Sequence, residues 1–136
     1  KLEKQFGLTK GINESVFEQL KAGLEKLKNK TSPTQERTQI IKQLERTFLL
    51  GLIDSMSKMK AGTTDAEKNL AKASALAFWL GVGYRFKDLT QLEKLTIDLL
   101  TGTSMEPAAF DAWFKALKEV LPDVGFQKTD LGTALD

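Results

Sequence analysis

The sequence predicts an all-α protein: a single compact bundle of about five helices whose second and third helices form a central antiparallel hairpin. Apolar residues recur at intervals of three and four along at least five stretches of the 136-residue chain. Residues typical of helix starts and stops flank most of these stretches. Sustained alternation of apolar and polar residues, which is typical of a half-buried strand, does not occur, and only residues 82–86 leave room for a short strand.

The first helix is expected over residues 13–28. Asn13 suits the N-cap, and Glu14 beside it suits the positive end of the helix dipole. The residues before it, 1–12, carry a weaker pattern, and we expect them to form either one loose turn of helix or a mobile arm of the single domain 1–136. One apolar stripe follows the helix, formed by Val16, Phe17, Leu20, Leu24 and Leu27.

The second helix has the clearest start and is expected to run from Pro33 to Lys60. The sequence Ser-Pro-Thr-Gln at 32–35 matches a capping box with proline at the first helical position, and Gly62 supplies a C-terminal stop. Its middle, residues 48–53, is apolar on every side. A helix that is apolar all round is buried all round, so this helix is predicted to lie at the centre of the bundle.

The third helix begins at a second capping box, Thr-Asp-Ala-Glu at 64–67. Because only residues 61–64 separate it from the second helix, the two should be antiparallel neighbours. Small side chains are predicted to lie opposite Gly51 and to let the backbones approach closely, so leucine at position 73 or 75 should overpack the contact. These small residues are Ala71, Ala73, Ser74, Ala75 and Ala77.

The end of the third helix is ambiguous, because two glycines within residues 80–87 are compatible with a helix, a kink or a loop. A fourth helix is expected over residues 89–101 and a fifth over 106–121, with Gly102 and Pro122 as stops. The tail, residues 123–136, is expected either to remain loosely docked or to fray, and its apolar anchors would be Phe126 and Leu131.

The chain contains neither histidine nor cysteine. Their absence excludes disulfides, thiolate nucleophiles, Ser-His-Asp arrangements and the commonest transition-metal ligands. We therefore expect no catalytic residue, no metal site and no cofactor, and we interpret the protein as non-enzymatic. The weakest alternative is an enzyme that uses lysine or carboxylates, which would require acids such as Asp54 and Asp98 to converge in one cleft.

The net charge of +2 argues against a nucleic-acid partner, because such domains are usually strongly basic. No apolar run approaches the ~20 residues that span a bilayer, so no transmembrane segment is expected. The compartment stays open; the lack of thiols and of an initiating methionine favours an exported or periplasmic protein over a cytoplasmic one.

The leading functional hypothesis is a helical domain that binds a protein partner. Its candidate residues are an aromatic cluster with an arginine, typical of binding hot spots when exposed and of a plain core when buried: Trp79, Tyr84, Arg85 and Phe86. The alternative is a carrier or sensor of an apolar small molecule held between helices. Its candidate pocket residues are Phe48, Leu52, Met56, Met59 and Phe78.

Overall fold

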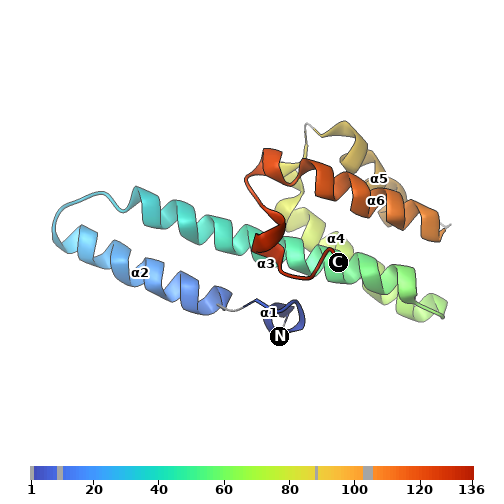
Figure 1. Cartoon of the computed structure of the whole chain (residues 1–136), viewed down its shortest axis with the longest axis horizontal. Helices are drawn as coiled ribbons and strands as arrows, with labels where there is room; N and C mark the ends of the chain where they lie inside the picture. Colours follow the sequence, from blue (N-terminus) through green and yellow to red (C-terminus); the bar gives the residue numbers. More distant parts are fainter. Residues whose placement is uncertain (1, 9–10, 88, 103–105) are drawn as a thin grey trace.

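The computed structural model describes residues 2–8, 11–87, 89–102 and 106–136, and these residues form helices and turns without any strand (Figure 1). The predicted all-α bundle is confirmed. The α-helices are α1 (Leu2–Gln5), α2 (Ile12–Lys28), α3 (Thr34–Ala61), α4 (Asp65–Val82), α5 (Thr90–Thr101) and α6 (Pro107–Val120). Short 3-10 segments follow α4 and α6: η1 (Gly83–Arg85), η2 (Pro122–Val124) and η3 (Lys128–Leu131).

Helix α3 is the longest described helix, and α2, α4, α6 and η3 contact it, whereas α5 packs on α6 and α4 (Figure 1). Its most extensive partner is α4, which confirms the predicted central hairpin. Helix α4 lies along the C-terminal half of α3, whereas α2 lies along the N-terminal half and projects with it beyond the rest of the bundle. The central position follows from the apolar middle of α3, where all residues from Leu49 to Met56 are buried.

Of the N-caps predicted for the first three helices, two are wrong. The capping box of α4 is confirmed: the Thr64 hydroxyl accepts the Glu67 amide at 3.2 Å, and the Glu67 carboxylate accepts the Thr64 amide at 3.1 Å. The hydrogen bonds that the Thr64 and Thr63 amides donate to the Glu67 carboxylate hold its pKa below its usual value. Helix α2 is instead capped by Gly11 and α3 by Pro33, both without a side-chain cap. Ser32 lies one residue before the N-cap position, and its hydroxyl forms a hydrogen bond of 2.6 Å with the Thr34 hydroxyl.

The close approach of α3 and α4 also differs from the prediction. Ala75 is buried in the contact, but Ala73 and Ala77 face solvent. A Cβ on Gly51 of α3 would lie 2.4 Å from the Phe78 ring, and a Cβ on Gly81 of α4 would lie 2.7 Å from the Phe48 ring. Each glycine therefore accommodates an aromatic ring of the opposite helix, so the pairing is glycine with phenylalanine.

The two ends of the chain meet beside α3. The Gln5 side-chain amide donates to Asp54 at 2.9 Å, and the Thr133 amide donates to the Phe6 carbonyl at 3.0 Å. Gly132 has φ +57°, and a Cβ there would lie 2.0 Å from that same carbonyl oxygen, so only glycine fits. In the tail, Phe126 and Leu131 are buried, which matches the docked alternative. Residues 1, 9 and 10 of the expected arm lie outside the described residues.

Candidate functional site

The aromatic cluster predicted as a partner surface mostly makes contacts within the fold. Phe86 is fully buried, so its ring is not available to a partner, and half-buried Trp79 stacks on it with ring centroids 5.9 Å apart. The Arg85 guanidinium donates to the Val124 carbonyl at 2.7 Å, which fixes the tail to the end of α4. Tyr84 is 56% exposed, but its hydroxyl donates to the Glu45 carboxylate, and this hydrogen bond raises the pKa of Tyr84.

The residues predicted to line a ligand cavity do not enclose one. Leu52, Met56 and Met59 are fully buried and belong to the continuous core. Phe48 is wedged against Gly81 as described above. Of the five candidates, only Phe78 lines the groove between α3 and α4 that is described next.

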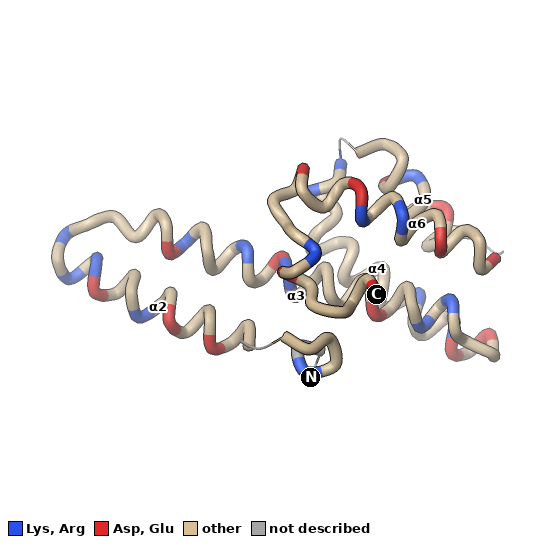
Figure 2. Tube along the Cα trace, in the orientation of Figure 1, with Lys and Arg blue, Asp and Glu red and all other residues tan. Residues whose placement is uncertain are grey.

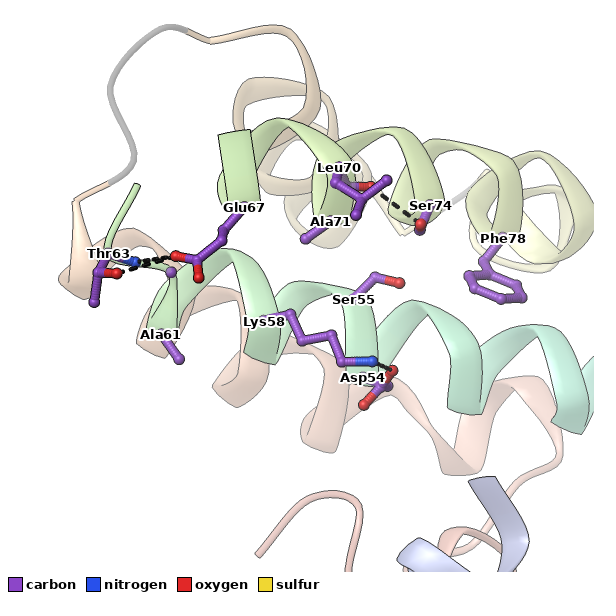
Figure 3. A pocket seen from close by; sticks show the side chains of 11 residues that line it. Asp54, Ser55, Lys58, Ala61, Thr63, Glu67, Leu70, Ala71, Ser74 and Phe78 are labelled. Carbon is purple, nitrogen blue, oxygen red and sulfur yellow. Dashed lines mark hydrogen bonds and ion pairs between the residues drawn. The ribbon is translucent and has the colours of Figure 1, made fainter. Parts of the chain in front are cut away.

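This groove between α3 and α4 has a volume of about 600 Å³ (Figure 3). Its apolar lining comes mainly from Leu70, Ala71 and Phe78 of α4. Most of its polar groups are already paired: Lys58 binds Asp54 at 2.5 Å, Glu67 caps its own helix, and the Ser74 hydroxyl donates to the Leu70 carbonyl. Since these groups are committed to the protein itself, they do not supply the convergent polar contacts typical of a small-molecule site.

The acids considered for catalysis do not share this groove. Asp54 lines it and is buried with two partners, Gln5 and Lys58, whereas Asp98 is exposed on α5 and does not line it. Among the residues that the structure describes, no group of three or more acidic side chains is placed to hold a metal ion. Within the same residues, no helix is both long enough and apolar enough to cross a bilayer.

A different surface, which we call the hairpin face, exposes several large apolar side chains of α2 and α3. It includes a groove of about 380 Å³ between these two helices. The side chains from α2 are 54–68% exposed and those from α3 are 42–49% exposed. The hairpin face is formed by Phe17, Leu20, Leu24 and Leu27 of α2 and by Ile41 and Leu44 of α3.

The hairpin face is exposed because α2 contacts α3 through a neighbouring stripe of residues. Gly23 is buried at the contact, where a Cβ would lie 3.5 Å from Pro33 Cβ and 3.6 Å from Glu36 Cβ. Lys26 Nζ, one turn further along, pairs with Glu36 Oε1 at 2.7 Å. At about 100° per residue, the apolar stripe of α2 is rotated roughly a quarter turn from this contact. It therefore points sideways, so that α3 leaves it uncovered and Leu20, Leu24 and Leu27 form one wall of the open groove.

On α3 the exposed side chains continue a stripe that is covered further along the helix. Ile41 and Leu44 are followed at helical spacing by Phe48, Gly51 and Ser55, which α4 covers. Helix α4 ends at Val82, and Tyr84 just beyond it contacts Glu45. The hairpin face is thus the part of one apolar surface that lies beyond the end of α4.

The charges around the hairpin face are unevenly distributed along α2. Figure 2 shows acidic residues near the start of α2 and mostly basic residues toward the tip of the hairpin. Glu14 and Glu18 lie at the first end, and Lys28, which pairs with Glu25 at 2.9 Å, and Lys30 lie at the second. Glu36 lies at the groove, only 8% exposed. Its hydrogen bond to Lys26 lowers its pKa, and its Oε2 has no hydrogen-bond partner among the described residues.

The stripe of α2 is recognisable in the sequence, but its exposure was not predicted. The sequence of the opposing helix indicates that the stripe is exposed. Residues 34–39 read Thr-Gln-Glu-Arg-Thr-Gln and contain no large apolar side chain. The second half of α2 packs beside this stretch, which cannot bury an apolar stripe. Comparing the chain with protein-family models, with curated proteins and with solved structures finds no match.

Proposed function

We propose that this domain is a non-enzymatic binding module for another protein and that the hairpin face is its binding surface. The observation that carries the proposal is the continuous exposure of six large apolar side chains on two adjacent helices. Monomeric proteins rarely leave contiguous apolar surface of this kind uncovered, and such patches commonly mark interaction sites. Isolated exposed leucines, by contrast, are ordinary and indicate nothing.

The shape of the surface favours a helix as the bound element. Two helices with apolar side chains spaced by three and four form a groove that a third amphipathic helix can enter, as in other helix-in-groove complexes. The groove is lined by Leu20, Leu24 and Leu27 on one wall and by Ile40 and Ile41 on the other. A helix bound there would follow the line of α4 beyond Val82, and it would bury the part of α3 that α4 leaves uncovered.

Two further observations support a protein partner over the alternatives. The core residues considered for a ligand cavity, Leu52, Met56 and Met59, are packed without exposure, which disfavours an apolar carrier. The chain has no histidine or cysteine, and the buried Asp54 carboxylate is paired with Lys58, which disfavours an enzyme.

Site-specific photocrosslinking tests this proposal in cells that express the protein naturally. A benzoylphenylalanine at Leu24 should capture a polypeptide, and the crosslinked peptide identified by mass spectrometry should be an apolar helical segment. The same probe at Leu70, which is 72% exposed on α4, is the matched control and should capture little. Adding Leu20→Lys to the Leu24 probe should abolish capture. Equal capture at the two positions, or none at Leu24, would reject the hairpin face as a binding surface.

A further inference from the structure

We infer that the groove between α3 and α4 is a binding site for a small neutral aromatic alcohol, of which a phenol is the simplest kind. The groove runs along the C-terminal half of α3, between the turn at Gly62 and the ring of Phe78 (Figure 3). Its volume of about 600 Å³ lies within the range of small-molecule pockets. The inference is independent of the proposed function, because no residue of the hairpin face lines this groove.

The feature that points to a ligand is a buried hydroxyl without a partner. Ser55 lines the groove and is only 3% exposed, and no described residue forms a hydrogen bond with its hydroxyl. A buried hydroxyl that lacks a partner is unfavourable. A serine within a helix commonly avoids this cost by bonding the carbonyl one turn earlier, as Ser74 does with Leu70. The Ser55 hydroxyl is therefore free to bind a group that enters the groove.

The groove is open because small side chains stand where larger ones would fill it. Ser55 follows Leu52 by three residues and precedes Met59 by four, and both of these neighbours are fully buried. At this spacing Ser55 occupies a core position on the face of α3 that contacts α4. The side chains of Ala71 and Ser74, which line the α4 wall, are small as well. The helix pair thus keeps both an open space and a hydroxyl at a position where an apolar side chain would close the contact.

The two serines of the groove face each other across it. Helices α3 and α4 are antiparallel, and Gly51 of α3 lies against Phe78 of α4. Four residues further along α3, and four residues back along α4, Ser55 is therefore level with Ser74. Figure 3 shows the Ser55 hydroxyl between the two helices, on the side of α3 that faces Ser74 and Phe78. A single polar group of a ligand can thus lie between the two hydroxyls.

The hydrogen-bonding capacities of these serines select an alcohol. The Ser74 hydroxyl donates its proton to the Leu70 carbonyl at 3.1 Å, so only its lone pairs remain and it can act as an acceptor. The Ser55 hydroxyl still has its proton to donate. A hydroxyl group between them would accept from Ser55 and donate to Ser74. A carbonyl group could accept from Ser55 but would offer nothing to Ser74.

The apolar lining on either side of the serines selects an aromatic body. Leu70 and Ala71 lie toward the turn, and the Phe78 ring closes the other end (Figure 3). Ser55 and Gly62 are seven residues apart, so this part of the groove is about 10 Å long. That length accommodates one aromatic ring with a short substituent, and the edge or face of such a ring packs favourably on the ring of Phe78.

The charged groups of the groove disfavour an ionised ligand. Lys58 is paired with Asp54 at 2.5 Å, and the Glu67 carboxylate accepts the amides of Thr63 and Thr64. Each charge is therefore satisfied within the protein and needs no opposite charge from a ligand. Two carboxylates against one ammonium leave a net negative charge, which would repel a fatty acid or another carboxylate.

Titration of the full chain with para-cresol, followed by amide NMR spectra, tests the site. The probe is a neutral ring with one hydroxyl and one methyl group. The amide signals of Ser55, Ala71 and Ser74 should shift and saturate with a Kd of about 1 mM, as expected for so small a ligand. The signals of Leu20 and Leu24 in the hairpin face should stay in place. Shifts that do not saturate, or that saturate in the hairpin face instead, would overturn the inference.

Matched serine variants test the role of the hydroxyl. Ser55→Ala should weaken para-cresol binding about two- to tenfold through the loss of one hydrogen bond, and it should leave the affinity for toluene, which has no hydroxyl, unchanged. Ser57→Ala makes the same substitution at an exposed position of α3 outside the groove and should bind both probes as the parent does. Undiminished para-cresol binding by Ser55→Ala, or an equal loss for both probes, would reject an alcohol as the ligand.

The stability of the free chain supplies a readout that needs no ligand. Alanine favours helices more than serine does, so Ser57→Ala should raise the midpoint of urea unfolding slightly. Ser55→Ala should raise it further, because this change also removes an unpaired buried hydroxyl. A midpoint for Ser55→Ala below that of the parent would mean that the hydroxyl is already bonded within the protein, and this result would overturn the inference.

Discussion

The two halves of α3 carry similar apolar patterns but differ in what covers them. In the C-terminal half, α4 and the rest of the bundle bury Leu52 and Met56 completely. In the N-terminal half, Ile41 and Leu44 belong to a stripe of the same spacing and remain more than two fifths exposed. The comparison teaches that helical periodicity identifies the apolar face of a helix but not the element that packs against it. That element can belong to another chain.

The halves also differ in how they hold their neighbours. The contact between α3 and α4 is formed by aromatic rings seated on glycines and by buried aliphatic side chains. The contact between α2 and α3 is narrower and includes Gly23 and the ion pair of Lys26 with Glu36. Apolar burial contributes more to stability than a partly exposed ion pair does, so the hairpin should be the less stable region.

Replacing one leucine by alanine in each half of α3 should give the largest difference in the free energy of unfolding. Leu52→Ala removes a fully buried side chain and should lower the free energy of unfolding by about 2–5 kcal/mol. Leu44→Ala makes the same chemical change at a half-exposed position and should alter it by no more than about 0.5 kcal/mol. Urea denaturation of both variants, at a concentration where the chain is monomeric, measures the difference. Similar losses for both would mean that the N-terminal half is covered within the monomer.

Substitutions at a buried and an exposed alanine of α4 test the same contact between α3 and α4 from the side of α4. Ala75→Leu inserts a larger side chain into the packed contact and should cost about 1–3 kcal/mol. Ala73 faces solvent two residues away, so Ala73→Leu should leave the melting temperature nearly unchanged. Thermal melts followed by circular dichroism distinguish the two. A larger decrease in melting temperature for Ala73→Leu than for Ala75→Leu would mean that α4 is rotated relative to α3.

The smallest effect concerns pH. The hydrogen bond from Lys26 lowers the pKa of Glu36 below 4.5, so the ionised carboxylate is favoured in the folded chain. Its stabilising contribution is present above the unfolded-state pKa, and it is lost as the pH falls through the folded value. Hydrogen exchange at neutral pH and at about pH 3 should therefore show a greater loss of protection in α2 than in α4. In Glu36→Gln this excess should vanish, and an unchanged excess would assign the pH sensitivity to another group.

Most of the architecture could be predicted because it depends on local chemistry. The capping box at Thr64, the stop at Gly62 and the uniformly apolar middle of α3 each act within a few residues, and each is present in the structure. The ring-on-glycine contacts could not be predicted. They depend on the axial offset of two helices, and Gly51 has no feature in the sequence that indicates Phe78 as its partner.

The candidate site was harder to predict than the fold. Exposure of an aromatic residue depends on the elements that fold over it, so Phe86 and Tyr84 look alike in sequence and differ completely in burial. The stripe of α2 was visible in the sequence, but its exposure follows from the rotation of α2 on α3, which Gly23 and the Lys26–Glu36 pair determine. Those polar and small residues carry weak signals when considered one at a time.

The contacts of Phe78 with Gly51 and of Phe48 with Gly81 also determine how much of α3 the helix α4 covers. If α4 slid along α3 by one residue, about 1.5 Å, Phe78 and Phe48 would each be displaced from the glycine that makes room for its ring. The contacts therefore fix the axial register of α4 to within a single residue. Because α4 ends at Val82, this register also decides where along α3 the uncovered apolar surface begins. Two glycines in the contact between α3 and α4 thus set the extent of the hairpin face.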